Sequence, residues 1–431
     1  MVRAKGVNNQ FVGCDTNITF INKENKMKAK DLLKGLRKKN DTGTAADADA
    51  IVHEFYDTGS YALNRVITGD VRKGVPRGRI TTIFGPSQSG KSLIAAQVVA
   101  NALKGGQIDG CFWVDSEGGG TQLLQNFGVD LEKVEYVPVL DAEDACVKLV
   151  NIYETLVQAH KEWEKDSDNN DEPKYIVVLD SFGGLASSKV VSDAVDKDKM
   201  VADQGMAAKT RNALIRTLMM RVVVSNCSLI VINHEYSNPG QMYPSKIRNM
   251  AGGQGIEYAS HVILQASKLL VKDGDTEFAT GKEGDSEKRG FYKGNRMRFF
   301  CIKNRVIKPA FEADVYIDFD TGISKYDGII KPAVDFGFIQ EVRGGYVVPT
   351  YKETRVTYKE LVSKDEIWDT FIEKFNEESA KKMAYTSKSD DAIAEIADEV
   401  AAIKSDTEKN KKKQKQKQLI VENNDDIPEE A

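Results

Sequence analysis

The stretch Gly85-Pro86-Ser87-Gln88-Ser89-Gly90-Lys91-Ser92 reads G-x-x-x-x-G-K-S, the pattern of a phosphate-binding loop. An apolar, β-branched run at 80–84 precedes it, and a helix-compatible segment at 93–100 follows it. The motif requires this strand–loop–helix context, so a Gly/Ser loop that matches by chance is the much weaker interpretation. The chain is therefore predicted to bind a nucleoside triphosphate through the whole run from Gly85 to Ser92.

Two residues of this loop have expected chemical roles. Glycines let the backbone fold tightly around phosphates with its N–H groups pointing inward, and the following helix adds the positive end of its dipole. Lys91 is expected to reach the β- and γ-phosphates, which makes it a catalytic candidate. The Ser92 hydroxyl is expected to bind Mg²⁺, so the motif predicts both a nucleotide and a magnesium ion.

Composition limits the remaining function classes. The chain has 431 residues, of which 41% are hydrophobic, enough for one large core. Its net charge of −5 gives no global nucleic-acid signature, so any such surface must be local. The five cysteines contain no C-x-x-C pair, which favours a reducing compartment over disulfides or zinc. No apolar run reaches transmembrane length and no signal peptide is evident, so we expect a soluble cytoplasmic protein.

Apolar segments followed by polar residues recur along the middle of the chain. Strands are predicted at 110–114, 175–179 and 228–232, and helices at 143–163 and 207–224. Non-alternating strands separated by helices are typical of an α/β fold with a mostly parallel sheet covered on both faces. Ligands bind such sheets at the carboxyl ends of the strands. Four polar residues lie at or just after predicted strand ends, which predicts one shared site: Lys91, Glu117, Asp180 and His234.

Composition also predicts four parts. These are an N-terminal oligomerisation arm at 1–50, an ATPase core at 51–345, a small segment at 346–388, and a helical then low-complexity charged tail at 389–431. The basic stretch 27–39 in the arm is either a solvated helix or a docking arm for a neighbouring subunit. Segments from about 268 to 302 predict a long β-hairpin around the turn region 273–294. In the tail, six lysines at 409–417 and five acids at 422–430 predict disorder.

Two carboxylates complete the predicted nucleotide site. Asp180 follows four apolar residues, the form of a Walker B strand, and is expected to hold Mg²⁺. Glu117 is a candidate general base that orients the attacking water. Asp115 competes for that role, and either acid could instead cap the following helix. His234 begins a long loop, where a polar residue could respond to the γ-phosphate, although a lone histidine is usually structural.

The loop at 238–253 is long for a compact domain, which indicates function. Aromatic and basic side chains with glycine hinges suit single-stranded nucleic acid, because rings stack on bases and cations meet phosphates. The alternative is an ordinary solvated loop. A second loop is expected at 187–203, where its mixed charge is poor evidence for any role. The predicted DNA-binding residues of the first loop are Met242, Tyr243, Lys246, Arg248, Gly252 and Gly253.

Lys303 and Arg305 lie far along the chain from the phosphate-binding loop. Two cations spaced in this way could stabilise charge that develops on a γ-phosphate, including that of the next subunit. A surface basic pair is the alternative, and composition does not choose between the two.

These motifs, in this order, resemble the RecA-type recombinases, and most of all their bacteriophage members. The resemblance covers roughly residues 55 to 345. Asp115-Ser116-Glu117 resembles the segment with the family's catalytic glutamate, and Leu179-Asp180-Ser181 resembles its Walker B strand. Asn233-His234 resembles the entry to the second DNA-binding loop, and Gly252-Gly253 its far end. Lys303-Asn304-Arg305 matches the paired cations that reach a neighbour's ATP.

The resemblance implies a DNA-dependent ATPase that forms a helical filament on single-stranded DNA. It implies ATP at subunit interfaces, homologous pairing and strand exchange, and roles in recombination, repair and recombination-dependent replication. Glu117 would be the base, His234 would couple the γ-phosphate to the loop, and double-stranded DNA would be the second substrate. Implied partners are a single-strand-binding protein and a recombination mediator. A phage-encoded protein would act in the host bacterial cytoplasm.

The sequence departs from the family pattern in three places. The family often has an aromatic residue that stacks on adenine near Leu123 or Leu124, where this chain has leucines. The N-terminal region matches poorly, so the polymerisation motif is not placed. The lysine run before the acidic tip is unfamiliar, and it could bind DNA or pair with the acids.

Other functions share some of these motifs. A hexameric helicase of the same fold would have the same nucleotide site but form rings and translocate without pairing homologous strands. A regulatory member that hydrolyses poorly is disfavoured by the intact Lys91, Ser92, Glu117 and Asp180. A GTPase is disfavoured because no N-K-x-D base-reading motif is present.

Overall fold

The computed structural model divides the chain into two units, Met1–His53 and Glu54–Ala431. The structure describes residues 51–166, 172–197, 205–236, 248–269, 279–280, 291–292, 294–318 and 322–385. Every helix and strand that it describes belongs to the second unit. The predicted arm at 1–50 and the tail at 389–431 lie outside the described residues, as do Met242, Tyr243 and Lys246.

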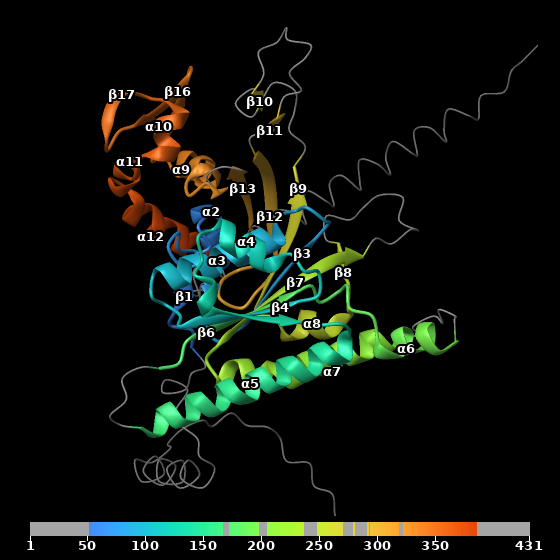
Figure 1. The fold of residues 1–431 in the computed structure, drawn as a ribbon. Helices are drawn as coiled ribbons and strands as arrows, with labels where there is room; N and C mark the ends of the chain where they lie inside the picture. Colours follow the sequence, from blue (N-terminus) through green and yellow to red (C-terminus); the bar gives the residue numbers. More distant parts are fainter. Residues whose placement is uncertain are drawn as a thin grey trace, which may run out of the picture. The chain divides into compact units, whose positions relative to one another are not determined.

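A large mixed sheet forms the centre of the second unit (Figure 1). Six neighbouring strands are parallel, in the order β9-β3-β7-β6-β4-β5. Their bounds are Ile80–Gly85 (β3), Gly110–Asp115 (β4), Val134–Pro138 (β5), Tyr175–Asp180 (β6), Ser228–Tyr236 (β7) and Val262–Lys268 (β9). The short β8, Asn249–Met250, pairs with the end of β7. The predicted α/β fold with a mostly parallel sheet is confirmed.

Side chains alternate between two hydrophobic layers along each central strand. Ile176 and Val178 join the layer that contains the helices α2 (Tyr61–Thr68), α3 (Lys91–Lys104) and α4 (Gly120–Asn126). Val177 and Leu179 join the opposite layer, with α5 (Ala142–Lys165), α7 (Met206–Val224) and α8 (Gln254–Ala259). Figure 1 shows the two groups of helices on opposite faces of the sheet. Both faces are buried, which is why these strands read as continuous apolar runs.

Three antiparallel strands extend the sheet beyond β9. They are β12 (Gly294–Asn304), β13 (Glu312–Asp318) and β14 (Gly322–Ile323). β9 and β12 are the arms of the predicted hairpin, with Lys268 opposite Met297. Between them, the two-residue strands β10 (Ala279–Thr280) and β11 (Phe291–Tyr292) pair with each other. The rest of the expected turn region at 273–294 lies outside the described residues, apart from Gly294 itself.

One predicted loop is a helix instead. The expected loop at 187–203 contains α6, Ser188–Lys197, within the part that the structure describes. The helix begins where the Ser187 carbonyl accepts hydrogen bonds from the amides of Val190 and Val191. Glu143 of α5 accepts a hydrogen bond from the Ser188 amide at 2.8 Å, which fixes this first turn. The predicted loop after Asp180 is therefore wrong over Ser188–Lys197, because the tertiary contact from α5 favours the helix.

The C-terminal region comprises η3 (Asp327–Ile329), α9 (Ile330–Asp335), the sheet β15 (Gln340–Val342), β16 (Gly345–Val348) and β17 (Lys352–Val356), and the helices α10 (Tyr358–Ser363), α11 (Asp365–Asp369) and α12 (Ile372–Met383). In this region, η3 and α12 contact α2, and most of the elements contribute side chains to the first layer. The Arg65 Nε donates to Ser379 Oγ at 2.8 Å, which joins α2 to α12. β15 begins before residue 346, where the sequence suggested a domain boundary.

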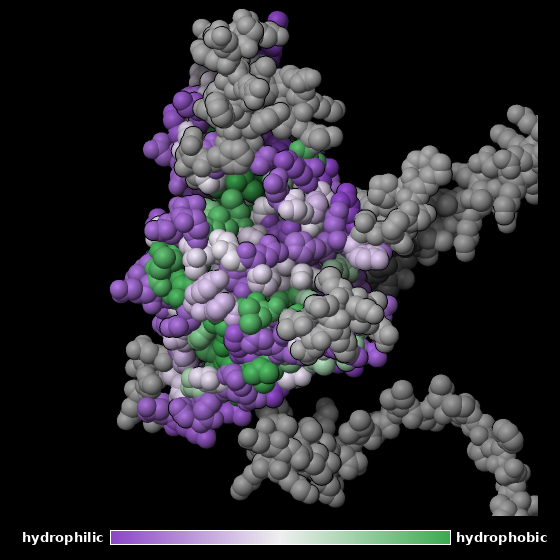
Figure 2. Space-filling view, turned by 45° about the vertical axis from the view of Figure 1, so that its right-hand side comes forward, coloured by the Kyte–Doolittle hydropathy of each residue, from purple (hydrophilic) through white to green (hydrophobic). Residues whose placement is uncertain are grey.

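Three short elements complete the fold. The strands β1 (Phe55–Tyr56) and β2 (Val75–Pro76) pair with each other, and η1 (Leu131–Lys133) leads into β5. Among the described residues, none of the helices combines the length and the apolar character that crossing a membrane requires. Apolar patches on the face in Figure 2 are small and separated by polar residues.

Candidate functional site

Four strand ends bring the predicted nucleotide-binding residues together. Gly85 lies opposite His234 across β3 and β7, and Asp115 lies opposite Asp180 across β4 and β6. A cavity of about 240 Å³ opens at this edge. Its lining includes the loop from Ser87 to Ser92, together with Glu117, Leu123, Asp180 and His234. The geometry therefore gathers the residues that the sequence assigned to one shared site.

The phosphate-binding loop is held by its own contacts. The Pro86 carbonyl accepts hydrogen bonds from Ser89 Oγ and from Lys91 Nζ, both at 2.8 Å. Gly90 has φ 75°, a left-handed conformation that an L side chain rarely adopts. A Cβ atom on Gly85 would lie 2.3 Å from the Ala266 carbonyl oxygen. Glycine is therefore required at both ends of the loop.

Lys91 is buried and faces three carboxylates. Burial lowers the pKa of Lys91 below its ordinary value. The carboxylates of three residues oppose that shift: Asp180, Glu117 and Glu235. The Lys91 ammonium group donates a hydrogen bond to the Pro86 carbonyl. This hydrogen bond must break before the ammonium group can reach a phosphate.

Asp180 and Ser92 form a donor set that fits Mg²⁺. Burial raises the pKa of Asp180 to about 6, although a hydrogen bond from Ser92 opposes the rise. The Asp180 Oδ1 atom is buried and has no hydrogen-bond partner within the described part of the chain. That part holds no group of three or more His, Cys, Asp or Glu residues that could ligate a metal. Mg²⁺ typically takes one or two carboxylates with phosphate and water oxygens, which matches a carboxylate beside a hydroxyl.

Asp115 and Glu117 have different environments. Asp115 Oδ1 accepts from the amides of Glu117 and Gly118, both at 2.7 Å, and its Oδ2 accepts from Gly120 at 3.1 Å. The buried Asp115 carboxylate therefore holds the turn that leads into α4, as one of the predicted alternatives required. The Glu117 carboxylate lines the cavity instead.

Glu117 belongs to a hydrogen-bonded triad with His234 and Ser181. His234 Nε2 lies 2.9 Å from Glu117 Oε1 and 3.0 Å from Ser181 Oγ. Burial raises the pKa of Glu117, but hydrogen bonds from Ser181 and His234 and the Lys91 charge lower it below the usual value overall. The carboxylate is thus kept ionised, the state that a general base requires. The sequence indicates no role for Ser181 beyond its position directly after the Walker B aspartate.

Lys303 and Arg305 lie at the other edge of the sheet. The Arg305 amide donates to the His261 carbonyl, and the His261 amide donates to that of Ile80, the first residue of β3. Lys303 Nζ and Arg305 Nη2 both donate to the Tyr258 carbonyl at the end of α8, at 3.0 and 2.9 Å. Neither cation lines the cavity of its own chain.

The stem of the predicted DNA-binding loop is ordered against β7. The Arg248 guanidinium donates to both Glu235 carboxylate oxygens at 2.7 Å. Gly252 and Gly253 have φ 95° and 81°, and Gly253 precedes the first residue of α8. A Cβ on Gly252 would lie 2.7 Å from the Phe182 ring. These glycines let the backbone pass close to Phe182, which lies two residues after the Walker B aspartate Asp180.

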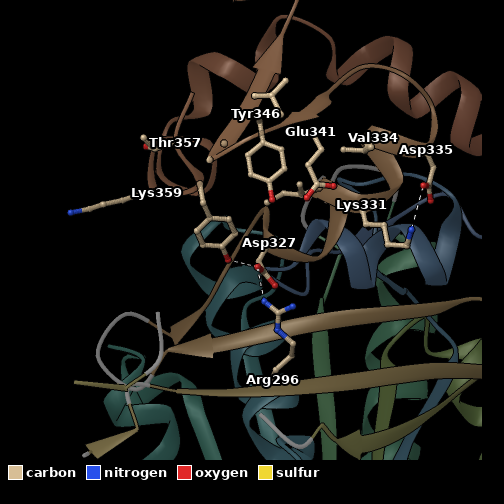
Figure 3. Close-up of a pocket in the computed structure, with 14 residues that line it drawn as sticks. Arg296, Asp327, Lys331, Val334, Asp335, Glu341, Tyr346, Thr357 and Lys359 are labelled. Atoms are coloured by element: carbon tan, nitrogen blue, oxygen red, sulfur yellow. Dashed lines mark hydrogen bonds and ion pairs between the residues drawn. The ribbon is translucent and has the colours of Figure 1, made fainter. Parts of the chain in front are cut away.

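A larger cavity of about 790 Å³ lies elsewhere, between β12, α9 and the C-terminal sheet (Figure 3). Asp327 is buried in its wall, where Arg296 donates to it at 3.1 Å and the Tyr358 hydroxyl also bonds to it. Burial raises the pKa of Asp327 above its usual value, against the opposing effect of Arg296 and Tyr358. Its lining contains none of the phosphate-binding or Walker B residues, so the nucleotide chemistry belongs to the smaller cavity.

Comparison with known proteins agrees with this geometry. A family model described as the RecA N-terminal domain matches residues 43–324. The chain is 26% identical over 307 residues, 71% of its length, to the recombination and repair protein (UvsX) of Enterobacteria phage T4, covering 69% of that protein. It is 27% identical over 323 residues to the RecA protein of Chloroherpeton thalassium, covering 74% of this chain and 79% of that one. It is 28% identical over 294 residues to the RecA protein of Aquifex aeolicus, covering 68% of this chain and 74% of that one.

The matched region contains the whole candidate site. It includes the phosphate-binding loop, the Glu117 turn, the Walker B strand and the cation pair at Lys303 and Arg305. The phage relative is a recombination and repair protein by name and the others are RecA proteins, which favours a recombinase over a ring helicase. The resemblance stated from the motifs is confirmed, and the chain belongs to the RecA family of recombinases.

Proposed function

We propose that this protein is a DNA-dependent ATPase that assembles on single-stranded DNA and catalyses homologous pairing and strand exchange. The observation that carries the proposal is the set Lys91, Ser92, Glu117 and Asp180 around one cavity, in a chain of the RecA family. Each member of the set has the chemistry that phosphoryl transfer needs: a cation, a hydroxyl and two carboxylates. Recombination, repair and recombination-dependent replication are the proposed contexts.

The residues around the cavity would have distinct roles in ATP hydrolysis. A magnesium ion held by Ser92 and Asp180 would neutralise phosphate charge when the nucleotide is bound. Lys91 would exchange the Pro86 carbonyl for the β- and γ-phosphates. Glu117 would orient the attacking water and accept its proton, since its lowered pKa keeps it ionised. His234, in contact with Glu117, would transmit the state of the γ-phosphate to β7 and the loop that follows it.

Lys303 and Arg305 are proposed to act on the nucleotide of a neighbouring subunit. They lie at the opposite edge of the sheet from the phosphate-binding loop, so their own chain's nucleotide is out of reach. A head-to-tail contact would place this edge of one copy against the cavity of the next. There the two cations would stabilise charge on the γ-phosphate. In their present positions, they are held by the Tyr258 carbonyl.

DNA and protein partners are also proposals. The loop that connects Tyr236 to Arg248 would contact single-stranded DNA, with double-stranded DNA as the second substrate. Arg248, Gly252 and Gly253 form the described part of that surface. A single-strand-binding protein and a recombination mediator are proposed as helper proteins. The cytoplasmic location stays a prediction.

The decisive experiment measures ATP hydrolysis with and without single-stranded DNA, with negative-stain images of the same mixtures. Strong stimulation together with long helical filaments supports the recombinase, and a strand-exchange assay then tests pairing. Lys91→Ala is the control, and we expect it to lose turnover. DNA-stimulated turnover with closed rings would favour a helicase, and turnover indifferent to DNA would contradict both functions.

A further inference from the structure

The end of β7 pairs with β8 through the backbone, and an ion pair joins it to Arg248, the residue before β8. Glu235 pairs with Met250 in the antiparallel register, and the Arg248 guanidinium donates to both Glu235 oxygens at 2.7 Å. The Arg248 amide also donates to Gln265 Oε1 of β9 at 2.9 Å. The backbone of Arg248 is therefore fixed, and its side chain is satisfied by a carboxylate only 20% exposed.

This ion pair adjoins the nucleotide site along one strand. Glu235 directly follows His234, whose ring contacts Glu117. The negative charge of Glu235 also raises the pKa of Lys91, against the effect of burial. At the other end of the stem, the Ala251 amide donates to the His234 carbonyl at 3.0 Å, and Asn233 Nδ2 donates to the Ala251 carbonyl at 2.8 Å. Glu235 thus connects His234 of the hydrogen-bonded triad, its neighbour in β7, to Arg248, the proposed DNA contact.

We propose that Glu235 is a positioning residue that occupies Arg248 in the DNA-free protein, and that a phosphate of single-stranded DNA must displace it to bind Arg248. The inference rests on the proposed function. Arg248 was predicted from sequence as a DNA contact, but its guanidinium is already neutralised by an internal carboxylate. A DNA phosphate is an anionic hydrogen-bond acceptor, like that carboxylate, so the two compete for one guanidinium.

The competition has two measurable consequences. Breaking a part-exposed ion pair lowers DNA affinity by a small factor, about two- to fivefold. It also changes the salt dependence, because an Arg248 side chain that stays paired with Glu235 displaces no counterion from the DNA. Removing the Glu235 charge should therefore steepen the slope of log affinity against log salt by about 0.7, the value for one contact with a single strand.

The experiment compares Glu235→Gln with the full-length wild type for binding of a fluorescent oligo-dT over a series of NaCl concentrations. Binding is measured without nucleotide and with a non-hydrolysable ATP analogue and Mg²⁺. We expect Glu235→Gln to bind about two- to fivefold more tightly without nucleotide, with the steeper slope. Glu154→Gln is the matched control, because it breaks the Glu154–Arg221 ion pair between α5 and α7. That control should leave affinity and slope unchanged.

A double-mutant cycle tests whether Glu235 acts through Arg248. In the Arg248→Gln background, Glu235→Gln should have no further effect on affinity or slope. An equal gain in both backgrounds would overturn the inference, because Glu235 would then act only as a nearby negative charge. Should Arg248→Gln fail to fold, the slope of the conservative Glu235→Gln variant decides alone, and an unchanged slope overturns the inference.

The wild-type data separate this inference from the proposed function. If the wild type binds oligo-dT with the ATP analogue, and Glu235→Gln has the same affinity and the same salt slope, only the competition at Arg248 is overturned. Wild-type protein that binds no oligo-dT under either condition overturns the proposed function and the inference together.

Discussion

Three acidic residues at or just after neighbouring strand ends have different roles because their surroundings differ. Asp115 is buried and accepts three backbone amides, so it shapes a turn. Asp180 is buried beside a hydroxyl with one oxygen unpartnered among the described residues, so it suits a cation. Glu117 faces the cavity and is kept ionised by hydrogen bonds, so it suits a base.

Replacing Glu117 with glutamine should separate binding from turnover. The amide keeps the shape of the side chain but accepts no proton, so we expect turnover to fall by about 10²- to 10⁴-fold while the nucleotide still binds. The variant should remain on DNA when ATP is present, and fluorescence anisotropy of labelled DNA checks this. Rapid release of DNA by this variant would count against Glu117 as the base.

Asp180→Asn should stabilise the protein without its cofactors in a pH-dependent way. The folded pKa of about 6 exceeds the unfolded value of about 3.9, so the folded state holds the proton more tightly. Stability therefore falls as the pH rises through this window, and the ionised carboxylate destabilises the fold above it. We expect the asparagine variant to gain on the order of 2 kcal/mol near pH 8 and clearly less near pH 5.

Denaturant unfolding at the two pH values measures that difference. The same variant should lose the extra stability that Mg²⁺ and nucleotide give the wild type, because the metal has lost its carboxylate. An identical gain at both pH values would show that the burial of Asp180 has been misjudged.

The sequence predicted which residues line the nucleotide cavity, but it did not predict the hydrogen-bond partner of each side chain. The phosphate-binding motif and the strand ends located Lys91, Ser92, Asp180 and Glu117, because parallel strands present their carboxyl ends at one edge. Ser181 in the triad and Glu235 opposite Arg248 depend on side-chain directions across strands, which no spacing in the chain reveals.

Among the elements, α4 shows how a glycine fixes the catalytic turn. A Cβ atom on Gly120 would lie 1.9 Å from Trp113 Nε1, while one on Gly119 would have no heavy atom within 4 Å. Gly120 also begins α4 and donates its amide to Asp115. The close approach of this helix to the indole therefore determines where the Glu117 turn lies.

Gly120→Ala should displace that turn, and Gly119→Ala should not. We expect Gly120→Ala to cost about 1–3 kcal/mol of stability and to reduce turnover at least tenfold, because α4 must move away from the indole. Thermal melts and ATPase assays of both variants check the expectation. Equal behaviour of the two alanine variants would show that the contact with Trp113 does not position Glu117.

Elements with a strong apolar period were predicted well, and those that depend on neighbours were not. The strands β4, β6 and β7 and the helices α5 and α7 begin within a few residues of their predicted positions. The sequence predicts a loop where α6 lies, and the contact from Glu143 that starts this helix comes from another helix. The three antiparallel strands were only partly foreseen, since β13 and β14 were not predicted.

For the whole molecule, one hydrophobic layer runs from the strands to the C-terminal helices. Ile83 of β3, Trp113 of β4 and Phe375 of α12 belong to the same buried cluster. The Arg65 guanidinium lies 5.9 Å from the Phe375 ring centre and bonds to Ser379. The C-terminal elements should therefore unfold together with the core rather than separately.

Phe375→Ala tests this cooperativity. The loss of a buried ring should lower the free energy of unfolding by about 3–5 kcal/mol. Fluorescence from Trp113 in β4 and from Trp368 in α11, each measured with the other two tryptophans replaced by phenylalanine, should report the same transition. Tyr385→Ala is the control, because this side chain is exposed and should change little. An earlier transition at Trp368 alone would show an independent C-terminal domain.

The placement of Lys303 and Arg305 at the opposite edge from the phosphate-binding loop has a kinetic consequence. Copies stacked head to tail would leave a bare cavity at one terminus of the stack and bare cations at the other. A subunit that adds at the first terminus places its cations against the cavity already exposed there. A subunit that adds at the second terminus instead places its own cavity against the exposed cations. The two termini would then add and lose subunits at different rates, so the direction of growth would follow from the chain's own asymmetry.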